Sequence, residues 1–201
     1  MAVPEEKLFW TVEEYFEFEK TSEVRHEYVD GVIYPVNFDF EGIAGESKRH
    51  NLISGELYAA LLIHLRGSGC QVFFEAVKLY TSASKYYYPD VVVTCDAETD
   101  KDDYTLNDPR LIIEVLSPTT ERVDRAEKLI AYQKIPSVQE YVLVSSERVW
   151  VQIYRRTDGE NWRVEQFLNL NDEVTFNSIN LIVKVADIYR NITFPPPKSE
   201  T

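Results

Sequence analysis

Two acidic residues inside runs of apolar residues are the first sign of chemistry in this sequence. Asp90 follows Pro89 and precedes three valines, and Glu114 interrupts the apolar run 111–116. A carboxylate in a buried strand is costly unless it is paired, hydrogen-bonded or bound to a metal. Two such strands side by side would bring both acids to one spot, where their hard oxygen atoms suit Mg²⁺ or Mn²⁺. A metal held there would polarise a phosphate and lower the pKa of an attacking water. The alternative is that each acid lies at a strand end, solvated or paired with an arginine.

The segment after Glu114 could supply a cation to such a site. Asp124 and Lys128 are four residues apart on a predicted helix, so they share a face, and Tyr132 lies four residues further on. Lys128 could reach over the strand end and either neutralise charge on a phosphate or orient the water. The alternative is a surface Asp–Lys ion pair that contributes little. Ser117 is either a hydroxyl of the site or an ordinary turn residue.

Two polar residues earlier in the chain could complete the site. His50 lies in the first turn of a predicted helix, three residues before Ile53, so it points toward the core. It could contact a phosphate or the surroundings of the metal, or it could be a half-buried histidine bonded to backbone. Glu27 lies among the apolar residues of a predicted hairpin strand and could supply a further carboxylate, although an exposed strand acid fits the pattern equally well.

The elements that must position these residues are visible in the pattern. Thr11 and Glu14 form a capping-box pattern, Ser47 and Thr120 are candidate N-caps, and Asp30-Gly31 is a hairpin turn signal. The nearly continuous apolar runs predict strands that are covered on both faces. The result is an α/β protein with a mixed sheet flanked by helices. We predict helices over residues 11–20, 47–66 and 121–134, and strands over residues 24–29, 32–34, 72–80, 86–93, 111–116, 140–144, 149–155 and 162–167.

Length, charge and cysteine content limit the remaining choices. A chain of 201 residues predicts one domain, which we place at residues 1–194 with residues 195–201 as a flexible tail. The net charge of −13 counts against binding nucleic acid by bulk electrostatics, although a nuclease needs only local positive groups. Two cysteines, Cys70 and Cys95, without a signal-peptide pattern or a membrane-length apolar run predict reduced thiols in the cytoplasm and no membrane partner.

Other common chemistries lack their sequence signatures. The chain has no glycine-rich phosphate loop, no Gly-x-Ser-x-Gly elbow, and no zinc spacing between its three histidines and two cysteines.

Taken together, these residues resemble the Uma-type endonucleases, a bacterial family within the PD-(D/E)XK nuclease superfamily. Any one matching piece is weak, but the pieces occur in the family's order over about residues 11–155 and are together quite specific. They are Glu27-Tyr-Val-Asp-Gly31, the helix at His50, Tyr88-Pro-Asp-Val91, Pro109-Arg-Leu-Ile-Ile-Glu-Val-Leu-Ser-Pro118, Asp124-Arg-Ala-Glu-Lys128, and Tyr132 through Glu140-Tyr141.

The resemblance implies a restriction-endonuclease-like fold and Mg²⁺-dependent cleavage of nucleic acid. Pro89-Asp90 corresponds to the family's "PD", Glu114 to its second acid, and Glu27 and His50 to further polar residues of the site. Leu116 stands where the superfamily has a lysine two residues after the second acid. The resemblance implies that Lys128 supplies it, with Lys78 as a weaker substitute.

Two hypotheses follow for function. The first is a metal-dependent endonuclease acting on DNA, in which Asp90 and Glu114 bind Mg²⁺ or Mn²⁺ and Lys128, Glu27 and His50 complete the site. Cleavage of both strands often uses two sites, so a homodimer is compatible with this hypothesis. The second is an inactive nuclease fold that binds protein or nucleic acid as a regulatory module, which Leu116 and the negative charge favour. A weaker third possibility is a metal-dependent hydrolase of smaller phosphate esters.

Overall fold

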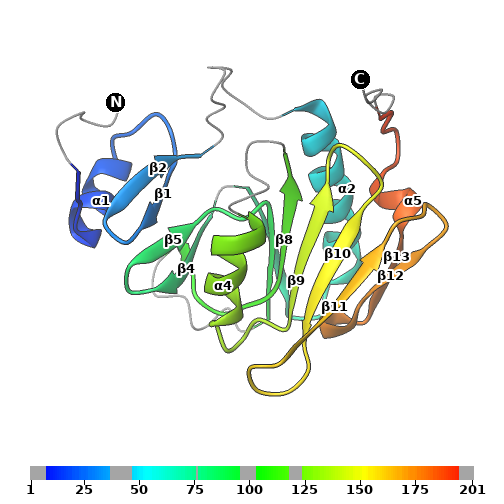
Figure 1. The fold of residues 1–201 in the computed structure, drawn as a ribbon. Helices are drawn as coiled ribbons and strands as arrows, with labels where there is room; N and C mark the ends of the chain where they lie inside the picture. Colours follow the sequence, from blue (N-terminus) through cyan, green and yellow to red (C-terminus); the bar gives the residue numbers. More distant parts are fainter. Residues whose placement is uncertain (1–7, 37–46, 76, 96–102, 118–123, 195–201) are drawn as a thin grey trace, which may run out of the picture.

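The computed structural model describes residues 8–36, 47–75, 77–95, 103–117 and 124–194. The described strands form a five-stranded sheet in the order β2-β1-β5-β4-β7, a six-stranded sheet in the order β11-β10-β9-β8-β6-β3, and a two-stranded sheet of β12 and β13 (Figure 1). Helices pack against these sheets, which confirms the α/β architecture with a mixed sheet.

The five-stranded sheet comes from the first part of the chain. Helix α1 (Val12–Glu19) begins with the predicted capping box of Thr11 and Glu14. It packs Tyr15 and Phe18 against the hairpin of β1 (His26–Val29) and β2 (Val32–Pro35). Asp30 and Gly31 have φ angles of 49° and 92°, as a two-residue hairpin turn requires. Strands β4 (Lys78–Ser82), β5 (Lys85–Tyr87) and β7 (Thr105–Leu106) complete this sheet.

The six-stranded sheet forms the centre of the molecule, and its strands are almost wholly buried where β8 and β9 pair in parallel. One face packs against helix α2 (Lys48–His64) through Ile53, Leu57 and Leu61. The opposite face packs against helix α4 (Leu129–Gln133), whose Ala131 and Tyr132 are buried. The strands of this sheet are β3 (Gln71–Phe74), β6 (Val91–Thr94), β8 (Pro109–Leu116), β9 (Glu140–Ser145), β10 (Val151–Arg156) and β11 (Trp162–Phe167).

A C-terminal unit extends the core on the α2 side of the sheet (Figure 1). It contains β12 (Glu173–Phe176), the 3₁₀ turn η3 (Asn177–Ile179), β13 (Leu181–Lys184) and helix α5 (Val185–Ile188). The sequence pattern did not predict these short elements, although Val174, Phe176 and Val185 are fully buried. No helix in the described part of the chain is long and apolar enough to cross a membrane.

Two predicted strands are wrong in the same way. Residues 72–80 form β3 and β4 instead of one strand, and residues 86–93 form β5 and β6. In each case the first and second halves belong to different sheets. The paired segments make one two-stranded ribbon that bends as it passes between the sheets, with Glu75 and Asp90 at the bend. The Glu75 N–H donates to the Asp90 carbonyl oxygen at 3.0 Å, and Glu75 has a φ of 53°.

The predicted helix 121–134 is described only from residue 124. Asp124–Lys128 form a π-helical turn, η2, that continues into α4. The predicted N-cap Thr120 lies outside the described residues, as do the terminal segments 1–7 and 195–201.

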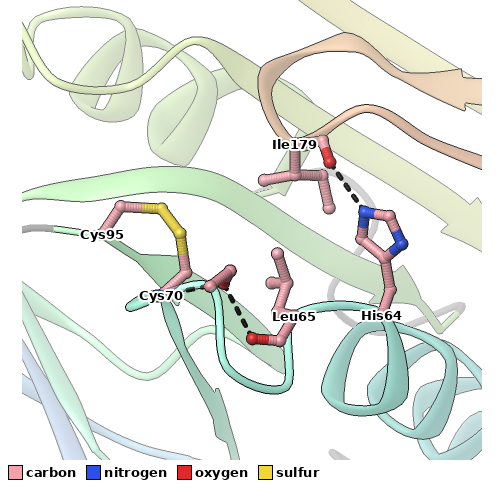
Figure 2. Close-up of a disulfide and its surroundings, with 6 residues drawn as sticks. His64, Leu65, Cys70, Cys95 and Ile179 are labelled. Carbon is pink, nitrogen blue, oxygen red and sulfur yellow. Dashed lines mark hydrogen bonds between the residues drawn. A yellow bond between two sulfur atoms is a disulfide. The ribbon is translucent and has the colours of Figure 1, made fainter.

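The prediction of reduced cysteines is contradicted. Cys70 and Cys95 form a disulfide across the ends of β3 and β6 (Figure 2). The antiparallel pairing of these strands places Gln71 opposite Thr94, so Cys70 and Cys95 are the next pair in register. The strand register that brings the two sulfur atoms together was not readable from the sequence.

Candidate active site

Asp90 immediately precedes β6, and Glu114 lies on β8, the neighbouring antiparallel strand. Val91 of β6 is opposite Ile113 of β8, and the same register places Asp90 opposite Glu114. The Asp90 Oδ2 atom accepts a hydrogen bond of 2.5 Å from the N–H of Val115. The Glu114 side chain is only 4% exposed. The two acids that the sequence singled out are therefore brought together where β6 begins beside β8.

Lys128 inserts its ammonium group between two carboxylates. Its Nζ atom lies 3.0 Å from Glu27 Oε1 and 3.2 Å from Glu114 Oε1, and the side chain is 8% exposed. The π-helical turn at residues 124–128 ends at this lysine, and single π-turns are often found at functional sites. Lys128 is thus a buried cation between two acids, and the alternative of an exposed surface ion pair is wrong for this lysine.

Tyr132 orients Glu114 from the next turn of the helix. Its hydroxyl donates to Glu114 Oε1 at 3.0 Å, and the residue is fully buried. Burial, reinforced by the negative charge of Glu114, raises the pKa of Tyr132 well above its usual value. The hydroxyl therefore keeps its proton and remains a donor to the carboxylate.

Glu27 and His50 approach the same place from two other elements. The backbone N–H of Tyr88 donates to Glu27 Oε1 at 3.2 Å, which ties β1 to the segment that leads into Asp90. His50 is buried in the first turn of α2, where Ser47 caps the helix by accepting from the His50 N–H. Its Nε2 atom lies 3.3 Å from Asp90 Oδ2. Neither residue is an exposed surface group.

All five residues proposed from the sequence thus converge, and each comes from a different segment of the chain. Lys78, the weaker substitute for the missing lysine, lies elsewhere: its Nζ atom is 3.8 Å from Glu19 Oε2 and packs over the rings of Tyr15, Phe16 and Tyr88. Lys128 is therefore the lysine that contacts Glu114. The donor roles of Tyr132 and of the Tyr88 N–H were not predicted, although Tyr132 was already visible at helical spacing from Lys128.

The carboxylates fit a hard divalent cation by their donor chemistry. The side chains of Asp90 and Glu114 are 13% and 4% exposed, and Mg²⁺ is commonly held by one or two carboxylates together with water and substrate phosphates. Among the described residues there is no group of three or more His, Cys, Asp or Glu side chains arranged to hold a metal. Lys128 lies between Glu27 and Glu114. Its ammonium therefore occupies the place at which Glu27 could join Glu114 as a third carboxylate ligand.

Comparisons with known proteins agree with this fold. The model of the Uma2 family, described as "Putative restriction endonuclease", matches residues 12–185. The chain is 36% identical over 183 residues to the uncharacterised protein slr1290 of Synechocystis sp., covering 90% of this chain and 92% of that protein. It is 28% identical to a second uncharacterised Synechocystis protein, sll1609, over 85% of this chain and 94% of the relative.

A solved structure has the same fold. A crystal structure from Anabaena variabilis, described as a "putative nuclease belonging to DUF820", superposes with a TM-score of 0.71 at 18% identity, covering 90% of this chain and 97% of the other. At this level of identity the likeness concerns the fold alone.

Proposed function

The chain belongs to the Uma2 family of restriction-endonuclease-like proteins, and from that premise we propose that it is a divalent-metal-dependent endonuclease that hydrolyses phosphodiester bonds of DNA. The observation that carries the proposal is the convergence of Asp90, Glu114 and Lys128 at one buried point, with Lys128 Nζ 3.2 Å from Glu114 Oε1.

Asp90 and Glu114 are the residues that would hold Mg²⁺ or Mn²⁺. Such an ion supplies charge stabilisation and an acidified water when it is bound. The chain's own contribution is to fix the two carboxylates. The Val115 N–H and His50 hold Asp90, while the Tyr132 hydroxyl holds Glu114. Ligands fixed in this way need little reorganisation, which is the main requirement of electrostatic catalysis.

Lys128 supplies positive charge to the phosphate. Its ammonium carries three donors, and two of its neighbours are Glu27 and Glu114. In this proposal it stabilises the negative charge that develops on the phosphate during in-line attack, or orients the attacking water. Glu27 positions the ammonium from the opposite side, because its Oε1 atom accepts from both Lys128 and the Tyr88 N–H.

A non-catalytic function remains the second candidate, and one observation favours it. Lys128 pairs with both Glu27 and Glu114, so these two carboxylates already have a cationic partner within the chain. In this alternative the domain binds nucleic acid or protein as a regulatory module, and its acids maintain the fold.

Nicking of supercoiled plasmid separates the two functions. We expect the wild-type protein to nick DNA with Mn²⁺ or Mg²⁺ and to lose this activity with a chelator. Asp90→Asn, Glu114→Gln and Lys128→Met should each abolish nicking. Asp103→Asn and Glu173→Gln change exposed acids outside the site and should retain it.

The other outcomes are equally informative. Absence of nicking by the wild type with every metal would refute the enzyme and support the binding module. Nicking that survives in both Asp90→Asn and Glu114→Gln would show that the reacting site lies elsewhere or that the preparation is contaminated. A parallel RNA substrate tests the choice of DNA, and a panel of small phosphate esters tests the weaker third function.

A further inference from the structure

A hollow lies at the end of the central sheet where β8 and β9 begin. It has a volume of about 600 Å³, which is within the range of small-molecule sites. It is separate from the candidate active site, since Asp90, Glu114, Lys128, Glu27 and His50 are absent from its described lining. The lining residues are Asp108, Arg110, Ser137, Gln139, Glu140, Arg155, Arg156, Thr157, Arg163, Glu165, Asn177 and Ser178.

The hollow is locally positive in an acidic protein. Four arginines and three carboxylates line it, whereas the whole chain carries a net charge of −13. Arg155 pairs with both Glu140 and Glu165, and Arg163 lies 3.1 Å from Glu165. With four arginines against three carboxylates, the lining has an excess of positive charge that is available to a ligand.

Glu140 does not face the hollow as a bare charge. Besides Arg155, the backbone N–H groups of Asn177 and Ser178 donate to it, at 3.0 and 2.9 Å. Arg156 is likewise engaged, because its guanidinium donates to the carbonyl oxygen atoms of Val138 and Ile135 among others. The polar groups of Glu140 and Arg156 are therefore bonded within the protein. Two other polar groups of the lining remain to bind a ligand.

Arg110 and Ser137 are those two groups. Arg110 is half-buried on β8, and within the part of the chain that the structure describes its guanidinium has no hydrogen-bond or ion-pair partner. The Ser137 hydroxyl is buried and also lacks a hydrogen-bond partner among the described groups. Buried polar groups are nearly always hydrogen-bonded, so an orphan needs an explanation. Arginine binds phosphate and carboxylate oxygens through its planar fork of donors.

From this geometry we infer that the hollow binds a small phosphorylated molecule. The guanidinium of Arg110 and the hydroxyl of Ser137 donate to the phosphate oxygens. The lining contains no lysine, so the hollow is not a patch of lysines that attracts anions by charge alone. Asp108, also without a described partner, accepts a hydroxyl or amino group from the rest of the ligand. Its negative charge disfavours a long polyanion, so the phosphate belongs to a small molecule instead of a nucleic-acid strand.

The phosphate of this site is not the phosphate to be cleaved. Arg110 and Glu114 are on the same strand and face, four residues apart, which corresponds to about 13 Å at the rise of a strand. A phosphate bound to Arg110 therefore lies well outside hydrogen-bonding distance of Lys128 and Glu114.

The test is titration of the metal-free full-length protein with inorganic phosphate and with glycerol 3-phosphate at constant ionic strength. We expect saturable binding by calorimetry and a matching rise in the thermal midpoint. Arg110→Gln should weaken binding at least tenfold. Ser137→Ala should also weaken it, and this variant keeps the proposal testable if Arg110→Gln does not fold. Arg66→Gln changes an exposed arginine outside the hollow and should bind as the wild type does.

Three results would overturn the inference. The first is no saturable binding of either phosphate compound by the wild type. The second is binding that is lost in Lys128→Met, assayed while still folded, but retained in Arg110→Gln, because the phosphate would then occupy the candidate active site. The third is a short oligonucleotide that binds the Asp90→Asn variant tightly and loses affinity when Arg110→Gln is added, while the small phosphates do not bind at all. The phosphate that enters the hollow would then belong to a nucleic-acid strand.

Discussion

Replacing Lys128 by methionine is the sharpest test of how the candidate site is held together. Methionine keeps most of the apolar volume and removes the charge that Glu27 and Glu114 share. At an effective dielectric constant of about 20, each contact of 3.0 and 3.2 Å corresponds to about 5 kcal/mol of Coulomb attraction before desolvation. Because removal of one partner leaves buried carboxylates uncompensated, we expect a net loss of about 3–5 kcal/mol in the free energy of unfolding.

The assay is urea denaturation at neutral pH followed by circular dichroism and by tryptophan fluorescence. Lys184→Met is the matched control, because Lys184 is exposed at the end of β13 and should change the free energy by less than about 0.5 kcal/mol. A double variant with Glu114→Gln should cost at least about 1 kcal/mol less than the sum of the two single variants, because the second change removes the uncompensated charge.

A loss below about 1 kcal/mol for Lys128→Met would refute this reasoning. It would mean that the two carboxylates are relieved by water or by protonation and that the buried ion pairs do not hold the site. Additivity of the double variant would lead to the same conclusion, since the two residues would then not interact energetically.

Four further predictions follow from the packing and the ionisable groups. Tyr132→Phe, which leaves Glu114 without a donor, should cost about 1–3 kcal/mol, and an unchanged urea midpoint would argue against the Tyr132–Glu114 hydrogen bond. Replacing both Cys70 and Cys95 by serine opens a loop with a sequence separation of 25. We expect a loss of about 3.5 kcal/mol, and thiol titration of the denatured wild type that finds two free thiols would show that the bond does not form. Leu61→Ala removes a fully buried side chain of α2 and should lower the free energy of unfolding by about 2–5 kcal/mol. A loss below about 1 kcal/mol would mean that α2 is not packed against the sheet as described. Burial raises the pKa of Tyr189 to about 12 and also raises that of Tyr132, so the folded protein retains protons that the unfolded chain releases near pH 10. The free energy of unfolding should therefore fall as the pH rises above about 10. Tyrosinate absorbance should rise together with the loss of circular dichroism, and a rise before that loss would contradict the burial of these hydroxyls.

Much of the candidate site was predictable because it depends on residue type and local pattern. A charged residue within an apolar strand is conspicuous, and both Asp90 and Glu114 had this signature. Lys128 was predictable from helical spacing, and its distance from Glu114 confirms that it faces the strand.

What the sequence did not reveal depends on pairing between distant segments. The runs 72–80 and 86–93 each read as one strand because apolar character continues through the bend, and a change of sheet leaves no mark in hydrophobicity. The Cys70–Cys95 bond and the Tyr88 N–H contact with Glu27 both depend on register between strands. The short elements of the C-terminal unit were missed because two to four buried residues give too little periodicity to recognise.

The bent ribbon at Glu75 and Asp90 has a mechanical consequence. Glu27 belongs to one sheet, Asp90 sits at the bend, and Glu114 belongs to the other sheet, so the spacing of these carboxylates is a measure of the angle between the two sheets. Because the ribbon connects the two sheets, a rotation of the five-stranded sheet about this bend would move Glu27 relative to the other two acids. A molecule bound to the outer face of that sheet would therefore change the spacing of the carboxylates around Lys128 without contacting any of the residues that form the site.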